Sequence, residues 1–472
     1  GYADLSFLPY AAEDVHTPNI DRIAERGVFF SNAYSTSPIC SPSRCGIMTG
    51  RYQQRWGNYW YGEGGLPANE KTLPQYLKDL GYYNVKIGKT HLNGGPVQHP
   101  LDHGFDEFFG NLYHLNAEDE PENVDYPKNP EFKKKFGPRG VIHSFADGKV
   151  EDTGPLNMKR METVDEEVTV AALDFIDRAH AADKPFFVWW NSTRMHVWTR
   201  LKDESQGVTG LGIYPDGMVE HDGHVGQLLA KLDELGIADN TIVMYSTDNG
   251  AEAMTWPDGG TIPFRGEKNT NWEGGYRVPS VIRWPGVIEP GTIHNEVFSH
   301  EDMLPTIMAA VGEPDIKEKL KAGGVQAIGR TYKSHIDGYN IMPFLKGEET
   351  ESPRREFLYW TDDGDIAALR YNNWKIVFME QRGHGFDVWQ EPFVTLRFPK
   401  LFNLRTDPFE RADHEGMGYQ RWRAERMFAL APAQAFVSNW LQSFVDFPPR
   451  QKPGSFSLSQ AMDKLTSNTS TN

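Results

Sequence analysis

Apolar residues along the chain alternate between a helical and an extended period. Residues 17–27 carry Ile20, Ile23 and Ala24 at helical spacing, begin at Thr17-Pro18 and end at Gly27, which is the pattern of a capped helix. Residues 28–34 follow as a short strand. The same order recurs, as helix and strand, at 72–80 and 82–87, at 164–179 and 186–190, and at 225–232 and 241–246. This alternation predicts an α/β fold, with a mostly parallel central sheet flanked by helices.

The pattern changes beyond about residue 345. Short strand-like segments joined by turns replace the alternation, at 356–361, 366–371 and 374–379, and a helical stretch follows at 421–444. We therefore expect two domains, because 472 residues exceed the size at which one core stops growing. Residues 1–345 would form the α/β domain, and residues 346–472 a smaller α+β subdomain built on an antiparallel sheet.

The net charge and the hydropathy of the chain argue against nucleic-acid binding and against a membrane span. The net charge of -17 argues against a general nucleic-acid binder, so an anionic ligand would need a local basic pocket. No apolar run approaches the roughly 20 residues that span a bilayer, and no signal peptide is visible. The sequence opens at Gly1 without Met, so the compartment stays open, with a periplasmic or secreted bacterial protein as the guess. The oligomeric state is not readable from the sequence.

Polar residues directly after the predicted strands are the first candidates for a site, because ligands of parallel sheets bind at the carboxyl ends of strands. Lys89 and His91 follow one strand, and His196 comes shortly after another. Asp248 and Asn249 follow a third strand and offer oxygen ligands suited to Ca²⁺ or Mg²⁺. A simple Asp-Asn-Gly turn is the alternative interpretation.

The two cysteines are close together, at Cys40 and Cys45, which leaves a bridge, two buried thiols or chemistry. Residues 40–50 predict a short helix with Ser41 as its cap, Pro42 in the first turn and Gly50 past its end. A helix amino terminus attracts anions, and Arg44 one turn in adds a planar cationic fork. The segment therefore favours an oxyanion site.

This segment resembles the Cys-x-Pro-Ser-Arg signature of the type I sulfatases, a family of the alkaline phosphatase superfamily. Cys40-Ser41-Pro42-Ser43-Arg44 matches it, and further motifs follow in the family's order, at 17–21, 48–51, 88–91, 247–250 and 264–279. The likeness covers most of the first 345 residues. It implies that a maturase oxidises Cys40 to formylglycine and that the substrate is an aryl or carbohydrate sulfate ester.

The resemblance also implies a role for each candidate residue. Asp248, Asn249 and the modified Cys40 would bind Ca²⁺, or Mg²⁺ in its place. Arg44, Lys89 and Lys268 would hold the sulfate oxygens while one hydroxyl of the hydrated formylglycine attacks sulfur. His196, with Lys268 as a possible helper, would protonate the leaving oxygen, and His91 would take a proton from the second hydroxyl to expel sulfate.

Three points stay open in this interpretation. The family's first strand ends in two aspartates that complete the metal site, and we expect it upstream of Gly1. The alternatives to a sulfatase are a phosphonate or phosphate monoester hydrolase of the same superfamily and a degenerate relative that only binds sulfated glycans. Trp198, Trp256 and Arg265 are candidates for contacting the leaving alcohol.

Overall fold

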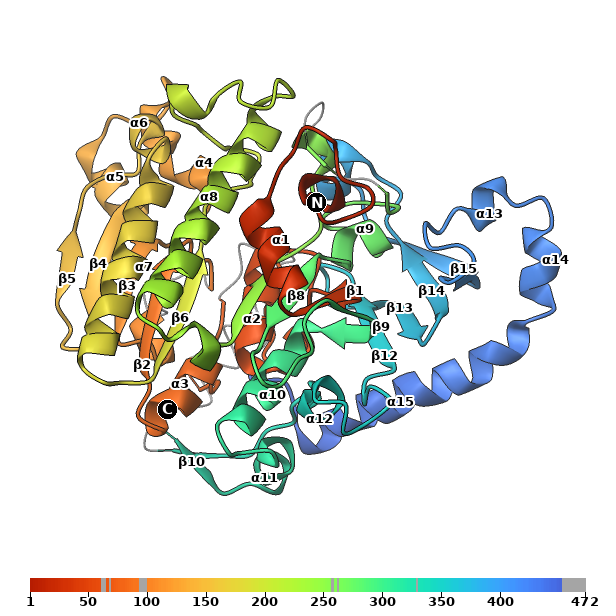
Figure 1. Ribbon diagram of the computed structural model, residues 1–472. Helices are drawn as coiled ribbons and strands as arrows, with labels where there is room; N and C mark the ends of the chain where they lie inside the picture. Colours follow the sequence, from red (N-terminus) through yellow and green to blue (C-terminus); the bar gives the residue numbers. More distant parts are fainter. Residues whose placement is uncertain are drawn as a thin grey trace.

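Two sheets form the centre of the molecule. A computed structural model of the chain describes residues 1–60, 65–67, 69–92, 100–255, 259–260, 263–327 and 330–451. One sheet has the strand order β7-β8-β1-β9 and the other β5-β4-β3-β2-β6 (Figure 1). In order along the chain, their bounds are β1 Val28–Tyr34, β2 Tyr83–Gly88, β3 Glu107–Asn111, β4 Val141–Phe145, β5 Val150–Asp152, β6 Phe186–Asn191, β7 Val243–Ser246, β8 Ser280–Arg283 and β9 Thr292–Ser299.

The strand directions confirm the predicted α/β class. In the first sheet only β8 runs against the others, and in the second only β4 does. The central sheet is thus mostly parallel in direction, although it is divided in two. Lys89 and His91 follow the carboxyl end of β2, His196 follows that of β6, and Asp248 and Asn249 follow that of β7.

Helices cover both faces of these sheets (Figure 1). Helix α1 contacts β1, β7 and β8, and α7 contacts β2, β3 and β6, while α8 packs on both of these helices. Helix α3 contacts β2 and packs with α2 and α10. The helix bounds are α1 Pro18–Glu25, α2 Cys40–Thr49, α3 Leu73–Asp79, α4 Leu115–Glu118, α5 Pro130–Phe136, α6 Met158–Met161, α7 Val164–Ala181, α8 Ile213–Glu234, α9 Glu273–Tyr276, α10 Met303–Ala310, α11 Ile316–Ala322, α12 Met342–Leu345, α13 Ala412–Glu415, α14 Tyr419–Ala424 and α15 Leu430–Asp446. Among the described residues, no helix is both long and apolar enough to cross a bilayer.

A cavity of about 900 Å³ lies between β6 and β7. All residues of both strands line it, together with apolar side chains of α7, α8 and α10, and its polar end reaches Arg44, Lys89, Asp248 and Lys268. Within the described residues β6 pairs only with β2, and β7 only with β8. The facing edges of the two sheets therefore present unpaired backbone groups to an apolar cavity.

The C-terminal sheet is antiparallel and has four strands, β12 Glu356–Trp360, β13 Ile366–Tyr371, β14 Trp374–Glu380 and β15 Val394–Asn403. A separate pair, β10 Val325–Ala327 and β11 Arg330–Tyr332, forms a small hairpin. Tyr34 and Tyr276 from the central part share one apolar core with Phe357 and Leu369 of the C-terminal sheet. The C-terminal sheet is thus packed directly against the elements that carry the site.

Local details depart from the sequence predictions in three places. The cap of α2 is Ile39 and makes no side-chain cap, so the assignment of Ser41 as cap was wrong. Helix α8 begins twelve residues before residue 225, because its glycine-rich first half hides the apolar period. The stretch 421–444 is divided between α14 and α15.

Candidate active site

Cys40 is the first residue of α2, and its side chain is buried. The first turn of a helix leaves backbone N–H groups without helical partners, and the helix dipole adds partial positive charge there. The helix ends at Thr49, and its cap is Gly50, whose φ of 66° is left-handed. Cys40 therefore lies where a bound anion would be stabilised by the backbone itself.

Arg44, one turn along α2, joins three elements of the site. Its Nε donates to Oδ2 of Asp248 at 2.7 Å, beyond the end of β7. Its Nη1 donates to Oδ1 of Asn191 at 2.7 Å and to the carbonyl of Lys89 at 3.1 Å. These contacts fix the guanidinium between the ends of β2, β6 and β7.

Lys86 and Asn191 are site residues that the sequence reasoning missed. The Lys86 ammonium is fully buried and donates to Oδ1 of Asn191 at 2.6 Å and to the Lys89 carbonyl at 2.8 Å. Burial, followed by Arg44 and Lys89, holds the pKa of Lys86 well below its usual value. The signal that could have revealed it is a lysine inside a strand predicted to be buried, where a charged side chain is unusual.

Lys89 and His91 lie in the loop after β2, as predicted. The backbone N–H of Lys89 donates to the Asn191 carbonyl at 3.0 Å, and His91 adopts a left-handed φ of 44°. Burial lowers the pKa of Lys89, the nearby Cys40 sulfur opposes this, and Arg44 reinforces it. Lys89 is therefore a desolvated cation beside Cys40.

Lys268 approaches Cys40 from another loop. Burial alone would lower its pKa, but Glu252, Cys40 and Asp248 together raise the pKa above its usual value. Oε1 of Glu252 lies 3.3 Å from the Lys268 ammonium. Lys268 consequently keeps its proton, and Glu252 is a further residue that sequence reasoning missed.

Three histidines form a cluster beside these cations. The ring of His114 lies edge-on to His91 at 5.6 Å between centroids and nearly parallel to His196 at 6.5 Å. Burial, then Lys89 and Lys268, hold the pKa of His196 well below its usual value. Burial, followed by His91 and Lys89, lowers that of His114 to about 3. In the resting protein both rings are neutral at neutral pH.

A buried hydrogen bond and buried ion pairs fix the loop that carries His196. Asp165 accepts from the backbone N–H of Thr193 at 2.7 Å and pairs with Arg194 at 2.7 Å. Arg194 also pairs with Glu220 at 2.8 Å, and none of its side chain is exposed. These contacts fix the backbone directly before His196.

The metal donors predicted from the sequence lie next to each other after β7. Burial would raise the pKa of Asp248, but Arg44, Lys89 and Lys268 lower it below the usual range, so the carboxylate is ionised. The amide of Asn249 is buried, and its Oδ1 has no partner within the described residues. An ionised carboxylate beside an unsatisfied amide oxygen fits a hard cation.

This pair alone does not make a complete metal site. Ca²⁺ takes about six to eight oxygen ligands. Within the described part of the chain, no group of three or more His, Cys, Asp or Glu side chains could hold a metal ion. Asp248 and Asn249 therefore fit as part of a ligand set.

Cys45 lies one turn past Cys40 but in different surroundings. Its thiol is fully buried in an apolar cluster with Met48, Trp56 and Leu92, and burial raises its pKa. Cys40 and Cys45 are both free thiols in the structure. Cys45 is consequently a packing residue without access to an anion.

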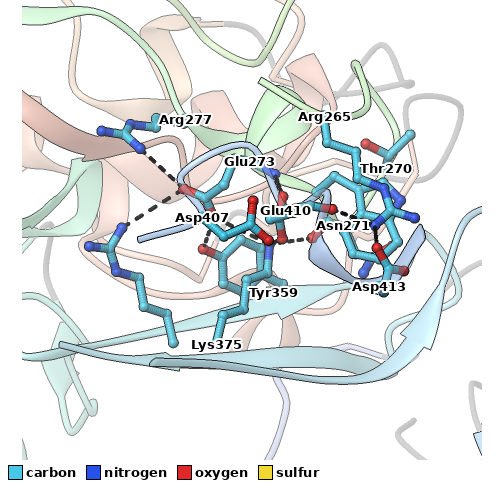
Figure 2. A network of polar contacts seen from close by, with 12 residues as sticks. Arg265, Thr270, Asn271, Glu273, Arg277, Tyr359, Lys375, Asp407, Glu410 and Asp413 are labelled. Atoms are coloured by element: carbon cyan, nitrogen blue, oxygen red, sulfur yellow. Dashed lines mark hydrogen bonds and ion pairs between the residues drawn. The ribbon is translucent and has the colours of Figure 1, made fainter. Parts of the chain in front are cut away.

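The loop of Lys268 is anchored to the C-terminal sheet by buried charges, shown in Figure 2. Glu273, at the start of α9, lies 3.2 Å from the Lys375 ammonium of β14 and accepts from the hydroxyl of Tyr359 at 2.6 Å. Glu410 pairs with Lys375 at 2.7 Å and accepts from the Glu273 backbone at 2.7 Å. The C-terminal sheet thereby positions the segment that presents Lys268.

The three residues predicted to contact the leaving alcohol differ in their surroundings. Arg265 packs over the Trp272 ring at 3.6 Å and pairs with Asp413 at 2.9 Å, so its charge is used in packing. Trp198 is 38% exposed. Trp256 lies outside the described residues.

Comparison with known proteins gives a consistent answer. The sequence model of the Sulfatase family matches residues 1–313. The N-acetylgalactosamine-6-sulfatase of Mus musculus is 33% identical over 444 residues, which cover 87% of this chain and 79% of that protein. Human arylsulfatase A is 29% identical over 473 residues, covering 96% and 88% respectively. The crystal structure of the PsFucS1 sulfatase from Pseudoalteromonas sp. aligns with a TM-score of 0.77 and 26% identity, covering 92% of this chain and 86% of that one.

Proposed function

This chain belongs to the sulfatase family and hydrolyses sulfate esters, and we propose that it does so through a formylglycine made from Cys40 and a bound Ca²⁺. One observation carries the proposal. Cys40, at the start of α2, lies near the charges of Lys89 and Lys268, and Arg44 follows one turn along the same helix and contacts the Lys89 carbonyl. Three cations gathered at the start of this helix suit the oxygens of a sulfate group in a molecule whose net charge is -17.

Arg44, Lys89 and Lys268 would each bind the sulfate oxygens in a different way. Arg44 is fixed by Asp248 and Asn191 and presents a rigid planar donor. Lys89 is desolvated, so its charge acts through a low local dielectric. Donors fixed before the reaction offset the charge that develops on sulfate oxygens as the bond breaks, at no cost in reorganisation.

Proton transfer falls to the histidines. His196 donates a proton to the leaving oxygen, and His91 takes a proton from a hydroxyl of the modified residue 40. Burial, followed by the charges of Lys89 and Lys268, keeps His196 neutral in the resting protein. The negative charge of a bound sulfate ester offsets the two lysine charges, and this part of the change raises the pKa of His196 and favours its protonation. Lys268 holds its own proton firmly, which makes His196 the better acid.

Formylglycine in its hydrated form supplies a hydroxyl nucleophile and a second hydroxyl whose deprotonation releases sulfate. Cys40 reaches the maturase as a free thiol in the motif Cys40-Ser41-Pro42-Ser43-Arg44. The modification would place both hydroxyls among the donors described above.

Ca²⁺ would be held by Asp248, Asn249 and the modified residue 40, and its charge would help to neutralise the sulfate oxygens. Two further aspartates are expected on a strand upstream of Gly1. The cavity between β6 and β7 supports this expectation, because it is apolar along two open strand edges and ends at Asp248. A strand there would join the two central sheets.

The test compares nitrophenyl sulfate with a nitrophenyl phosphonate ester on one preparation of the full-length protein, coexpressed with a maturase. We expect preferred turnover of the sulfate. Asn249 motivates this expectation, because the phosphonate hydrolase branch tends to have His at this position. Preferred phosphonate turnover would overturn the proposal. An unmodified Cys40 in the mass spectrum together with no bound calcium would instead point to a glycan-binding relative.

A further inference from the structure

We propose that Trp389 and Trp60 form an aromatic corner that binds the sugar ring of a sulfated saccharide, so that the physiological leaving group is a pyranose alcohol. This inference rests on the proposed function, since the corner is defined by its position beside the proposed sulfate-binding lysine. It adds a binding site for the part of the substrate that departs.

Trp389 lies beside the cationic cluster. It ends the short helix η9 (Gly385–Trp389), in the connection between β14 and β15. The Lys268 ammonium lies 5.8 Å from the centroid of its ring. A sulfate group bound to this ammonium would lie within reach of the indole, and in our proposal the leaving alcohol extends towards it.

Trp60 gives the corner its second wall. Its ring lies 5.8 Å from that of Trp389 at an interplanar angle of 67°. It belongs to the segment that follows the short helix η2 (Gln53–Arg55), which comes after α2 in the sequence. Both indoles are only partly buried, so each keeps ring surface open to a ligand.

The corner is anchored to the residues on either side of Lys268. Asn269 donates to the Val388 carbonyl at 3.1 Å, directly before Trp389. Glu267 accepts from the Gly385 backbone N–H at 2.9 Å, at the first residue of η9. The sulfate-binding lysine and the aromatic wall are therefore held in one rigid arrangement, as specific binding of both substrate parts requires.

The polar groups around the corner favour a sugar over a plain aryl ring. Oδ2 of Asp362 lies 3.2 Å from Nδ2 of Asn269, and His384 precedes η9 with 85% of its side chain exposed. A pyranose presents C–H groups on a face and hydroxyls around its edge, so it stacks on an indole while its hydroxyls pair with such groups. Asp362 is also held by Asn269, and Nδ1 of His384 lies 2.9 Å from Oε1 of Glu267, so both groups are fixed in place. A sugar offers hydroxyls to their remaining donor and acceptor positions, and an aryl ring offers none.

The experiment measures KM and kcat for galactose and glucose monosulfates and for nitrophenyl sulfate, with the mature full-length enzyme. Trp389→Ala should raise KM for at least one sugar sulfate by about tenfold or more, with kcat within about threefold. Its kcat/KM for nitrophenyl sulfate should change by less than about threefold. Trp389→Phe should recover part of the loss, which keeps the test valid if the alanine variant folds poorly.

Phe386→Ala is the matched control, because Phe386 lies on the same short helix and is 65% exposed. It should leave both substrates unaffected. An equal loss of kcat/KM for sugar and aryl sulfates in Trp389→Phe would contradict the proposal that the corner binds a sugar. Turnover of nitrophenyl sulfate by the wild type without turnover of any sugar sulfate would contradict it as well. If neither substrate class is turned over although residue 40 is modified, the proposed function itself fails.

Discussion

Nε of Arg44 and Oδ2 of Asp248 lie 2.7 Å apart, which joins the proposed sulfate-binding cation directly to a proposed metal ligand. The pair is mostly buried, with 10% and 20% of the two side chains exposed. Arg44 contributes to the low pKa of Asp248, so the carboxylate is ionised before any metal arrives. Anion binding and cation binding therefore depend on each other in this site.

The first prediction concerns the oxyanion donors. Arg44→Ala or Lys268→Ala should lower kcat/KM for nitrophenyl sulfate by about 100-fold or more, since one oxyanion donor is typically worth about 3 kcal/mol. Arg421→Ala is the control, because its side chain is 87% exposed. Wild-type turnover by a soluble, metal-loaded Arg44 or Lys268 variant would refute the role given to that residue.

The second prediction concerns the metal. Asn249→Ala should weaken Ca²⁺ binding to the full-length protein by at least about tenfold, because its unpaired Oδ1 supplies one ligand. Calorimetric titration of the chelator-treated protein measures this without any substrate. An unchanged Ca²⁺ affinity would show that Asn249 is a turn residue and not a metal ligand.

The third prediction separates the two cysteines. Cys40→Ala should abolish activity, and Cys40→Ser should be nearly inactive unless the host matures serine, because a single hydroxyl cannot release sulfate by elimination. Cys45→Ala should keep most of the activity, since Cys45 is buried in an apolar cluster. An aldehyde-reactive hydrazide should label the peptide containing position 40 in the wild type and in Cys45→Ala. Labelling that depends on Cys45 would contradict the mechanism.

The fourth prediction concerns acid stability. Burial lowers the pKa of His221 to about 4 and that of His300 to about 4, whereas an unfolded histidine titrates near 6.5. The unfolded chain therefore binds more protons as the pH falls. The stabilisation is complete above about pH 6.5 and is lost towards pH 4, at up to about 1.4 kcal/mol per pH unit for each ring.

Thermal unfolding across this pH range measures the effect. His221→Phe keeps an aromatic ring against Trp190, whose ring lies 5.4 Å away, and removes one titrating group. The slope of Tm against pH should become shallower in this variant. A slope identical to that of the wild type would exclude His221 as a contributor.

The fifth prediction concerns the buried charges in Figure 2. Lys375→Met leaves Glu273 and Glu410 without their shared cation and should lower the free energy of unfolding by about 3–5 kcal/mol. Glu410→Gln keeps the pair of Lys375 with Glu273 and should cost about 1 kcal/mol or less. Urea unfolding of both variants provides the measurement, and the reverse order of stability would show that Glu410 is the principal partner of Lys375.

The sequence was most informative where periodicity and chemistry coincide. The helix before β1 and the strands β2 and β6 were predicted within one or two residues, because their apolar runs are short and bounded by Gly or Pro. Lys89, His91 and Asp248 were found because they follow such strands. Their roles, however, came from the family motifs rather than from spacing.

Other parts of the site could not be predicted for a physical reason. Asn191 and His114 acquire meaning only through contacts with Arg44 and His91, which lie far away in the sequence. Strand β8 runs against its neighbours and interrupts the helix–strand alternation that guided the prediction. The division of the central sheet at β6 and β7 has no signal in either strand, since both are apolar along their length.

Three consecutive residues, Glu267, Lys268 and Asn269, point to three different places: the start of η9, the sulfur of Cys40 and the turn after β12. A chimera that exchanged residues 346–451 with those of a relative would keep the lysine but lose the partners of both its neighbours. Exchanging residues 264–277 alone would fail for the converse reason. Leaving-group preference in this protein should therefore be transferable between relatives only when both stretches move together, and laboratory recombination within this family should respect that joint unit.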